Sequence, residues 1–289
     1  MAKKNLKTYY EKAKKQGWAM TQFNVSCLEQ MQGVMEAAIA KKAPVLFGTS
    51  EGDSSFLHMP QAVALVESYR KETGLPVFLN FDHGKTLEIL QSAADAGYDA
   101  LHFDGSAHEF KENIALAKKV VAMARKKKIS VVEGEFGEIP GGHSEFHKNT
   151  ALVLDKENYT DPEQAREFVK KTGVDSLAVL IGTVHGVFHK NPPLDIERLQ
   201  EIRNRVTCFY VLHGGSGTPE NDLAAAIRNG VVKVNISTDL RAAFVLALRD
   251  TMAKNPEEIA PYKILPPSIE AVRKVAEGHL LLMGSANKI

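Results

Sequence analysis

Short apolar runs alternate with longer segments of helical periodicity along this 289-residue chain, in about eight strand–helix units. The predicted strands are continuous apolar runs such as 177–181, which is typical of parallel strands that are covered on both faces. Eight such units predict an α/β fold of the (β/α)8 TIM-barrel type, in a single domain over residues 1–289; a barrel of this kind typically takes about 250 residues. An open doubly wound sheet gives the same pattern along the chain and stays an alternative.

The expected elements follow one another in strict alternation. Strands are expected at 19–25, 44–49, 76–81, 99–103, 130–134, 176–181, 207–212 and 231–236. Helices are expected at 28–41, 60–72, 86–96, 109–127, 162–171, 194–203, 219–229 and 238–253, with one more at 268–282. The stretch after the fifth strand is rich in Gly and His and is expected to be irregular.

Composition and charge limit the class of partner. Hydrophobic residues make up 44% and charged residues 25% of the chain, as in a soluble globular protein. The formal net charge is +1, from 36 Lys and Arg against 35 Asp and Glu, which argues against nucleic acid or a membrane surface as the main partner. Cys27 and Cys208 are too few for a disulfide framework, and no apolar run approaches the roughly 20 residues that span a bilayer. We therefore expect a cytoplasmic protein.

Polar residues gather at the carboxyl ends of the predicted strands, where barrel enzymes carry their catalytic residues. Three of these ends run into a His followed directly by Gly: His83, His185 and His213. Three neutral imidazoles with a fourth position open to substrate are the catalytic arrangement of Zn²⁺. The sequence therefore predicts a zinc site at the barrel mouth, although each His taken singly also fits a hydrogen-bonded histidine of the core or of a loop.

Three carboxylates lie beside the predicted ligands. Asp82 precedes His83 and suits general acid/base work next to a Lewis acid; alternatively, it orients a ligand imidazole. Glu135 and Asp104 end two further strands. Each is either an alternative metal ligand or a member of the same hydrogen-bond network.

Two junctions between a strand and a helix offer backbone N–H groups to an anion. One is the Gly-Gly-Ser-Gly at 214–217, and the other is the Asn-Ile-Ser-Thr at 235–238. Helix N-termini attract anions, and the loops after strands seven and eight are the usual phosphate site of a barrel. The alternative is ordinary turn and capping chemistry, with Thr218 and Ser237 as caps. The residues alone predict a metal-assisted reaction on a phosphorylated small molecule, and they leave carbon–carbon cleavage and hydrolysis open.

Several motifs, in order, resemble those of the class II fructose-bisphosphate and tagatose-bisphosphate aldolases, and the resemblance covers essentially the whole chain. They are Phe-Asp-His-Gly at 81–84, Asp-Gly-Ser at 104–106, Glu-Gly-Glu at 133–135, Gly-Thr-Val-His-Gly at 182–186, Leu-His-Gly-Gly-Ser-Gly at 212–217, Lys-Val-Asn-Ile-Ser-Thr-Asp at 233–239 and Gly-Ser-Ala-Asn at 284–287.

The resemblance implies roles for these residues. The three histidines match the ligands of a catalytic zinc ion, while Glu135 and Asp104 match an alternative or second position for a divalent or monovalent cation. Asp82 matches the acid/base at the C4 hydroxyl, and Asn235 matches the residue that holds the dihydroxyacetone-phosphate part and its enediolate. The residues that match the substrate- and phosphate-binding set are Ser50, Gly186, Gly214, Gly215, Ser216, Asn235, Ser237 and Thr238.

The implied reaction is reversible aldol cleavage of a ketose 1,6-bisphosphate to dihydroxyacetone phosphate and glyceraldehyde 3-phosphate. Fructose 1,6-bisphosphate is expected ahead of tagatose 1,6-bisphosphate. Zinc stabilises the enediolate, so no lysine Schiff base is needed. A metal-dependent barrel hydrolase would usually carry a His-x-His pair on the first strand, and 19–25 has no His. A sugar-phosphate binder without activity is a further alternative, and the family implies a homodimer or homotetramer.

The loop after the fifth strand departs from the family pattern. Members usually carry paired acids just past a Gly-Gly, whereas His143 stands there in this chain. Glu138, His143 and Glu145 are all candidates for the proton donor to the enediolate, and we take Glu138 as the catalytic residue.

Overall fold

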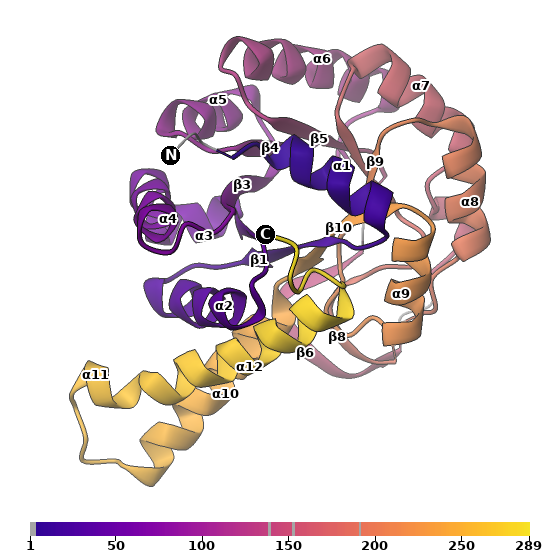
Figure 1. The fold of residues 1–289 in the computed structure, drawn as a ribbon. Helices are drawn as coiled ribbons and strands as arrows, with labels where there is room; N and C mark the ends of the chain where they lie inside the picture. The colour runs from indigo at the N-terminus through magenta and orange to yellow at the C-terminus, as the bar shows by residue number, and fades with distance from the viewer. Residues whose placement is uncertain (1–3, 138–139, 152–153, 191) are drawn as a thin grey trace.

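The barrel is closed. The computed structural model describes residues 4–137, 140–151, 154–190 and 192–289. Its eight parallel barrel strands follow one another in the order β1-β10-β9-β7-β5-β4-β3-β2 (Figure 1), which confirms the (β/α)8 barrel and excludes the open sheet. These strands are β1 (Met20–Asn24), β2 (Val45–Thr49), β3 (Val77–Gly84), β4 (Ala100–Asp104), β5 (Val131–Glu135), β7 (Ser176–Ala178), β9 (Phe209–Leu212) and β10 (Val231–Ile236).

Helices surround the barrel (Figure 1). Local sequence explains their ends: Asp161 accepts hydrogen bonds at the start of α7, Pro162 occupies its first turn, and Gly173 ends it with φ +72°, a backbone conformation that suits glycine. The helices of the outer ring are α2 (Leu28–Lys41), α3 (Glu51–Leu57), α4 (Met59–Thr73), α5 (Leu87–Ala96), α6 (Phe110–Lys126), α7 (Pro162–Thr172), α8 (Ile196–Arg205), α9 (Glu220–Arg228) and α10 (Thr238–Lys254), with a short 3₁₀ turn at Lys156–Asn158.

Helix α1 (Leu6–Gln16) lies outside the predicted pattern and crosses the amino-terminal end of the barrel (Figure 1). Its buried positions Leu6, Tyr9, Tyr10 and Ala13 recur at helical spacing. They pack against the apolar side chains that point inward at this end, among them Phe78. The helix therefore seals the end opposite the predicted site.

The inward-facing side chains change from apolar to polar along the strands. On β3, Phe78 belongs to the apolar layer under α1, and the buried Asn80 and Asp82 follow at steps of two, which is the period of a strand. The same progression gives Met20, Gln22 and Asn24 on β1, Ala100, His102 and Asp104 on β4, and Val131, Glu133 and Glu135 on β5. The carboxyl end of the barrel is therefore lined with polar groups.

The stretch predicted to be irregular contains a strand, so that expectation was wrong. Strand β6 (Gly141–Ala151) pairs in parallel with β8 (His185–Lys190) in a separate two-stranded sheet. Its partner lies about 40 residues further along the chain, and such non-local pairing leaves no periodic signal in the local sequence.

Helix α10 and helix α12 (Pro266–Leu282) project together beyond the barrel, with α11 (Pro261–Ile264) at the tip of this arm (Figure 1). Helix α12 also packs closely on α2, because a Cβ atom at Gly33 would lie 2.6 Å from the carbonyl oxygen of Ile269. Along the described ranges, no helix combines the length and apolar character needed to cross a membrane.

Candidate active site

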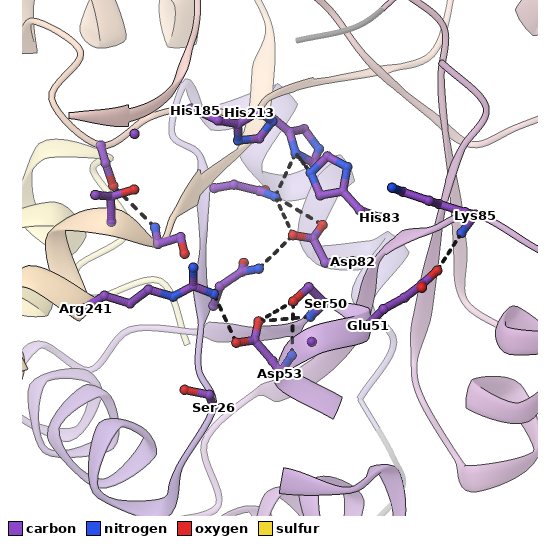
Figure 2. A pocket seen from close by; sticks show the side chains of 18 residues that line it. Ser26, Ser50, Glu51, Asp53, Asp82, His83, Lys85, His185, His213 and Arg241 are labelled. Atoms are coloured by element: carbon purple, nitrogen blue, oxygen red, sulfur yellow. Dashed lines mark hydrogen bonds and ion pairs between the residues drawn. The ribbon is translucent and has the colours of Figure 1, made fainter. Parts of the chain in front are cut away.

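A cavity of about 460 Å³ opens at the carboxyl end of the barrel (Figure 2). It gathers residues from strand ends that are far apart in the sequence. Of the predicted site residues, those that line it are Ser50, Asp82, His83, His185, Gly186, His213, Gly214, Ser216, Asn235, Ser237 and Thr238. Gly215 does not line it; its amide N–H donates to the carbonyl oxygen of Asn235 at 3.0 Å.

Two imidazoles present nitrogen atoms to each other in this cavity. Nδ1 of His83 lies 2.9 Å from a carboxylate oxygen of Asp104, and Nε2 of His213 lies 2.7 Å from one of Glu133. A carboxylate only accepts hydrogen bonds, so each of these nitrogens donates. The remaining nitrogens, Nε2 of His83 and Nδ1 of His213, lie 3.0 Å apart, and Nδ2 of Asn235 lies 3.2 Å from Nδ1 of His213. Burial alone would lower the pKa of His83, but the carboxylates of Asp82 and Asp104 raise it, so Nε2 of His83 donates to Nδ1 of His213 when the His83 ring is protonated. A cation between the two nitrogens would take the place of that proton.

Such an arrangement suits a metal ion. Two nitrogen ligands at about 2.0–2.1 Å from one tetrahedral Zn²⁺ are separated by roughly 3.3 Å, close to the distance found here. Imidazoles that donate their second N–H to a carboxylate are the usual form of zinc ligands. Burial lowers the pKa of His213, which keeps its lone pair available. The side chains present therefore fit the metal.

His185, the third predicted ligand, lies near the other two rings. It begins β8, just beyond the barrel strand β7, and its backbone N–H donates to the carbonyl oxygen of Pro140 at 2.9 Å. Its ring centroid lies 5.2 Å from that of His83 and 6.0 Å from that of His213. The three rings cluster on one side of the cavity (Figure 2).

Two groups of side chains bring metal-capable atoms close together: one is Asp82, His83, His102 and His213, and the other is His83, Asp104 and Glu135. Among the described residues, His185 belongs to neither group. The carboxylate of Glu135 lies 3.9 Å from Nδ1 of His83. Its Oε2 is buried and makes no hydrogen bond within the described part of the chain. Nε2 of His102 lies 3.1 Å from it without a well-aligned hydrogen bond. A buried carboxylate oxygen that lacks an aligned donor is costly, so a cation bound beside it would stabilise it further.

Asp82 lies next to the histidines and is held by amide donors. Nδ2 of Asn24 donates to it at 2.8 Å, and Nδ2 of Asn235 lies 3.3 and 3.4 Å from its two oxygens. Burial alone would raise the pKa of Asp82, but the charge of neighbouring His83 prevails and lowers it well below its usual value. The carboxylate is therefore ionised at neutral pH and can accept a proton from a bound ligand.

A buried ion pair supports His213 from behind. Glu133 receives the N–H of His213 on one oxygen, and Nζ of Lys233 lies 2.7 Å from the other. Both Lys233 and Glu133 are inaccessible to solvent. Burial alone would raise the pKa of Glu133, but the ammonium of Lys233 prevails and lowers it well below its usual value.

The prediction missed Glu133, Lys233, His102 and Asn24, although each contacts a predicted site residue or its immediate partner. A signal for all four was present: each stands on a predicted strand, and Glu133, His102 and Lys233 lie two positions before Glu135, Asp104 and Asn235. Side chains two apart on a strand point to the same face, so the polar lining continues inward.

The predicted anion site is assembled from both loops. The Ser216 hydroxyl accepts the backbone N–H of Ser237 at 3.3 Å and that of Asp239 at 3.2 Å. Gly214 has φ +65°, and a Cβ there would lie 2.2 Å from the carbonyl oxygen of Val184, so only glycine fits. The loop after β9 is thereby fastened to the N-terminus of α10.

Capping does not account for the polar residues at these junctions. Thr218 donates to the carbonyl oxygen of Gly214 at 2.9 Å, and Pro219 rather than Thr218 is the N-cap of α9. Ser237 is the N-cap of α10, but its side chain makes no capping hydrogen bond to the described residues. Side-chain capping by Thr218 and Ser237 is therefore wrong, whereas the turn hydrogen bonds of Thr218 are present. The Ser216 hydroxyl takes the N–H of Asp239 in the first turn of α10, and the positive end of this 17-residue helix still attracts an anion.

Away from the three histidines, charged side chains line the cavity (Figure 2). Ser50 caps α3 together with Asp53, and Asp53 also pairs with Arg241 at 3.0 Å. Lys85 lines the same cavity. Of the candidate proton donors, Glu138 lies outside the described residues, and the side chains of His143 and Glu145 are not described.

The chain matches one known protein family over nearly its whole length. Residues 4–288 match the family model described as fructose-bisphosphate aldolase class-II. The chain is 35% identical to a fructose-bisphosphate aldolase from Staphylococcus aureus (strain Mu50 / ATCC 700699) over 96% of this chain and 95% of that protein.

Solved structures are similar over nearly their full length. The YdjI aldolase from Escherichia coli K12 superposes with a TM-score of 0.84 at 32% identity, covering 98% of both chains. A putative fructose-1,6-biphosphate aldolase from Coccidioides immitis gives a TM-score of 0.84 at 26% identity, covering 100% of this chain and 99% of that one.

Proposed function

Because the chain belongs to the class II fructose-bisphosphate aldolase family, we propose that it cleaves a ketose 1,6-bisphosphate to dihydroxyacetone phosphate and glyceraldehyde 3-phosphate. Fructose 1,6-bisphosphate is the first candidate substrate and tagatose 1,6-bisphosphate the second. The observation that carries the proposal is the ionised Asp82, which lies beside the two imidazole nitrogens, Nε2 of His83 and Nδ1 of His213, that approach each other to 3.0 Å.

His83, His185 and His213, whose rings lie near one another, would hold a zinc ion. Asp104 and Glu135, which lie close to His83, would hold an alternative position or a second cation. The chemistry that Zn²⁺ supplies when bound is Lewis-acid polarisation of the substrate ketone and stabilisation of the negative charge left on the ketone fragment. Asp104 and Glu133 contribute by fixing the ring orientation and tautomer of two of the ligands.

Asp82 accepts the proton of the C4 hydroxyl as the bond between C3 and C4 breaks. Its lowered pKa keeps it deprotonated before the reaction, and the side-chain amides of Asn24 and Asn235 hold both of its oxygens in place. Asn235 reaches the same region from β10, where it is positioned to contact the ketone fragment. Returning a proton to that fragment needs a second group, and Glu138 stays our candidate.

The two ends of the cavity suit two phosphate groups. One would bind where Gly186, Gly214 and Ser216 meet the N-terminus of α10, as expected for an anion at a helix start. The other would bind near Ser50, with the ammonium of Lys85 and the guanidinium of Arg241 to offset its charge.

We further propose a homodimer or homotetramer in the cytoplasm. Exposed apolar side chains on the arm support an interface, because Ile259 is 88% and Tyr262 is 77% accessible. Cys27 and Cys208 are both free thiols, as is usual in a reducing compartment.

A coupled assay for dihydroxyacetone phosphate tests the proposal with both sugars. Asp82→Asn should lower kcat by about 10²–10⁴-fold, the range for loss of a general base, while metal content stays at the wild-type value. Asp95→Asn, which removes an exposed carboxylate from an ion pair with Lys127, is the matched control and should keep full activity. Wild-type turnover by Asp82→Asn would overturn the assignment of the base.

A further inference from the structure

A β-bulge lies at the pair of residues on which the proposed chemistry depends. Phe81 pairs with Leu101 and Gly84 pairs with Phe103, so two residues of β3 oppose the single residue His102 of β4. Within the bulge, His83 has φ +52°, a left-handed conformation that is uncommon for a residue with a side chain. Bulges of this kind re-aim side chains next to active sites.

A bulge leaves a backbone N–H outside the ladder, and here a side chain takes it. The amide N–H of His83 donates to Nδ1 of His102 at 3.1 Å. His102 is completely buried inside the barrel. A backbone amide always donates, so Nδ1 of His102 accepts, and the ring proton lies on Nε2.

The other ring nitrogen of His102, Nε2, faces Glu135 of β5. Nε2 lies 3.1 Å from Oε2 of Glu135, although neither atom is aligned for a hydrogen bond. Nδ1 also lies 3.4 Å from Oδ1 of Asp82, a longer contact than the 3.1 Å to the His83 amide, which is the donor that Nδ1 accepts. The ring therefore lies between the bulge and the carboxylate of β5, with its orientation set by the His83 amide.

We propose that His102 is a positioning residue that fixes the bulge at Asp82–His83. By accepting the His83 amide it holds the left-handed turn that points the His83 imidazole toward His213 and the Asp82 carboxylate toward the cavity. The expected loss of kcat rests on the proposed function. The expected change in the direction of the His83 side chain does not.

Three substitutions of His102 test whether the site needs a hydrogen-bond acceptor for the His83 amide or only a side chain of similar volume. In His102→Asn the δ oxygen takes the place of Nδ1 and can accept the His83 amide. In His102→Gln the polar atoms lie one bond further out, at the position of Nε2, and His102→Leu offers no acceptor. We expect the Leu and Gln variants to lose roughly 100-fold in kcat, the scale for a displacement of about 1 Å at a reacting group, and the Asn variant to recover most of it.

The visible spectrum of the Co²⁺-loaded protein gives a readout that is independent of turnover. A displaced His83 imidazole changes the ligand field, so the Leu and Gln variants should show shifted absorption bands and the Asn variant the wild-type bands. His108→Leu, which removes a partly exposed imidazole next to Glu112, is the control and should match wild type in both measurements.

The variants test the role of His102, and the activity of the wild type tests the proposed function. A Leu variant with the wild-type kcat and spectrum would overturn it, as would an Asn variant impaired as much as the Leu variant. If the Leu variant does not fold, the comparison of Asn with Gln makes the same decision. If wild type cleaves neither sugar, the proposed function fails, and the Co²⁺ spectra still test the position of His83.

Discussion

The buried pair of Lys233 and Glu133 provides a quantitative test of how the barrel interior supports the site. Lys233→Met removes the ammonium that lies 2.7 Å from Oε2 of Glu133 and keeps a long, unbranched side chain in its place. Both side chains are shielded from solvent, at 0% and 3% exposure, so the carboxylate would be left buried without its main counter-charge.

Removing one partner of a buried ion pair costs about 3–5 kcal/mol. His213 still donates to the other oxygen of Glu133, so we expect a value near the lower limit, about 3 kcal/mol. Since each kcal/mol shifts the melting temperature of a large domain by about 2–4 °C, Tm should fall by roughly 10 °C. Urea denaturation followed by circular dichroism measures the free energy of unfolding directly.

The double variant Lys233→Met/Glu133→Gln removes both charges and should recover about 2 kcal/mol of the loss. Lys254→Met, which breaks an exposed pair with Asp250, is the matched control and should change stability by less than about 1 kcal/mol. If Lys233→Met costs no more than this control, Lys233 does not offset the charge of Glu133 and the reasoning is wrong.

The pH dependence of this difference follows from the lowered pKa of Glu133. A carboxyl group whose folded pKa is depressed contributes its full stabilisation above its unfolded pKa of about 4.3 and loses it as the pH falls through the folded value. The destabilisation by Lys233→Met should therefore be largest above about pH 5 and shrink in acid. A difference that grows as the pH falls would contradict this account.

Three further changes have expected outcomes. Glu133→Gln should weaken Zn²⁺ binding by about 10–100-fold in a chelator competition, because His213 loses the carboxylate that fixes its tautomer; unchanged affinity would argue against His213 as a ligand. Gly214→Ala should lower Tm and raise KM for the sugar bisphosphate, because its Cβ would meet the Val184 carbonyl at 2.2 Å; a variant with wild-type Tm and KM would show that this contact relaxes freely. Ser216→Ala should raise KM with little effect on kcat, since its hydroxyl fastens the two anion-binding junctions; a loss confined to kcat would place it in the chemistry instead.

Much of the barrel could be predicted because its information is local. Parallel strands covered on both faces give continuous apolar runs, and each helix between them carries its own periodicity and end signals, as α7 does with Asp161 and Gly173. The pairing of β6 with β8 depends on contacts between distant segments. Helix α1 has a clear buried face, but it stands outside the strand–helix alternation on which the prediction was built.

The site also has residues that could be predicted from the sequence and residues that could not. Residues at the strand ends, such as His83 and His213, could be predicted because the fold brings all carboxyl ends to one mouth. His102 and Glu133 could not be assigned from those ends, since they lie one layer deeper and act on other side chains. The orientation of His185 also depends on β8, an element the sequence analysis did not anticipate.

Zn²⁺ titration of metal-depleted protein tests the central proposal most directly. Release of dihydroxyacetone phosphate from fructose 1,6-bisphosphate and from tagatose 1,6-bisphosphate would be followed as the ion is added, for wild type and for His213→Ala. We predict negligible cleavage without metal, a rise to a plateau as the zinc site fills, and no such rise in the His213→Ala variant. Full cleavage by protein shown to be free of metal, or an unchanged titration for His213→Ala, would contradict the proposed zinc aldolase.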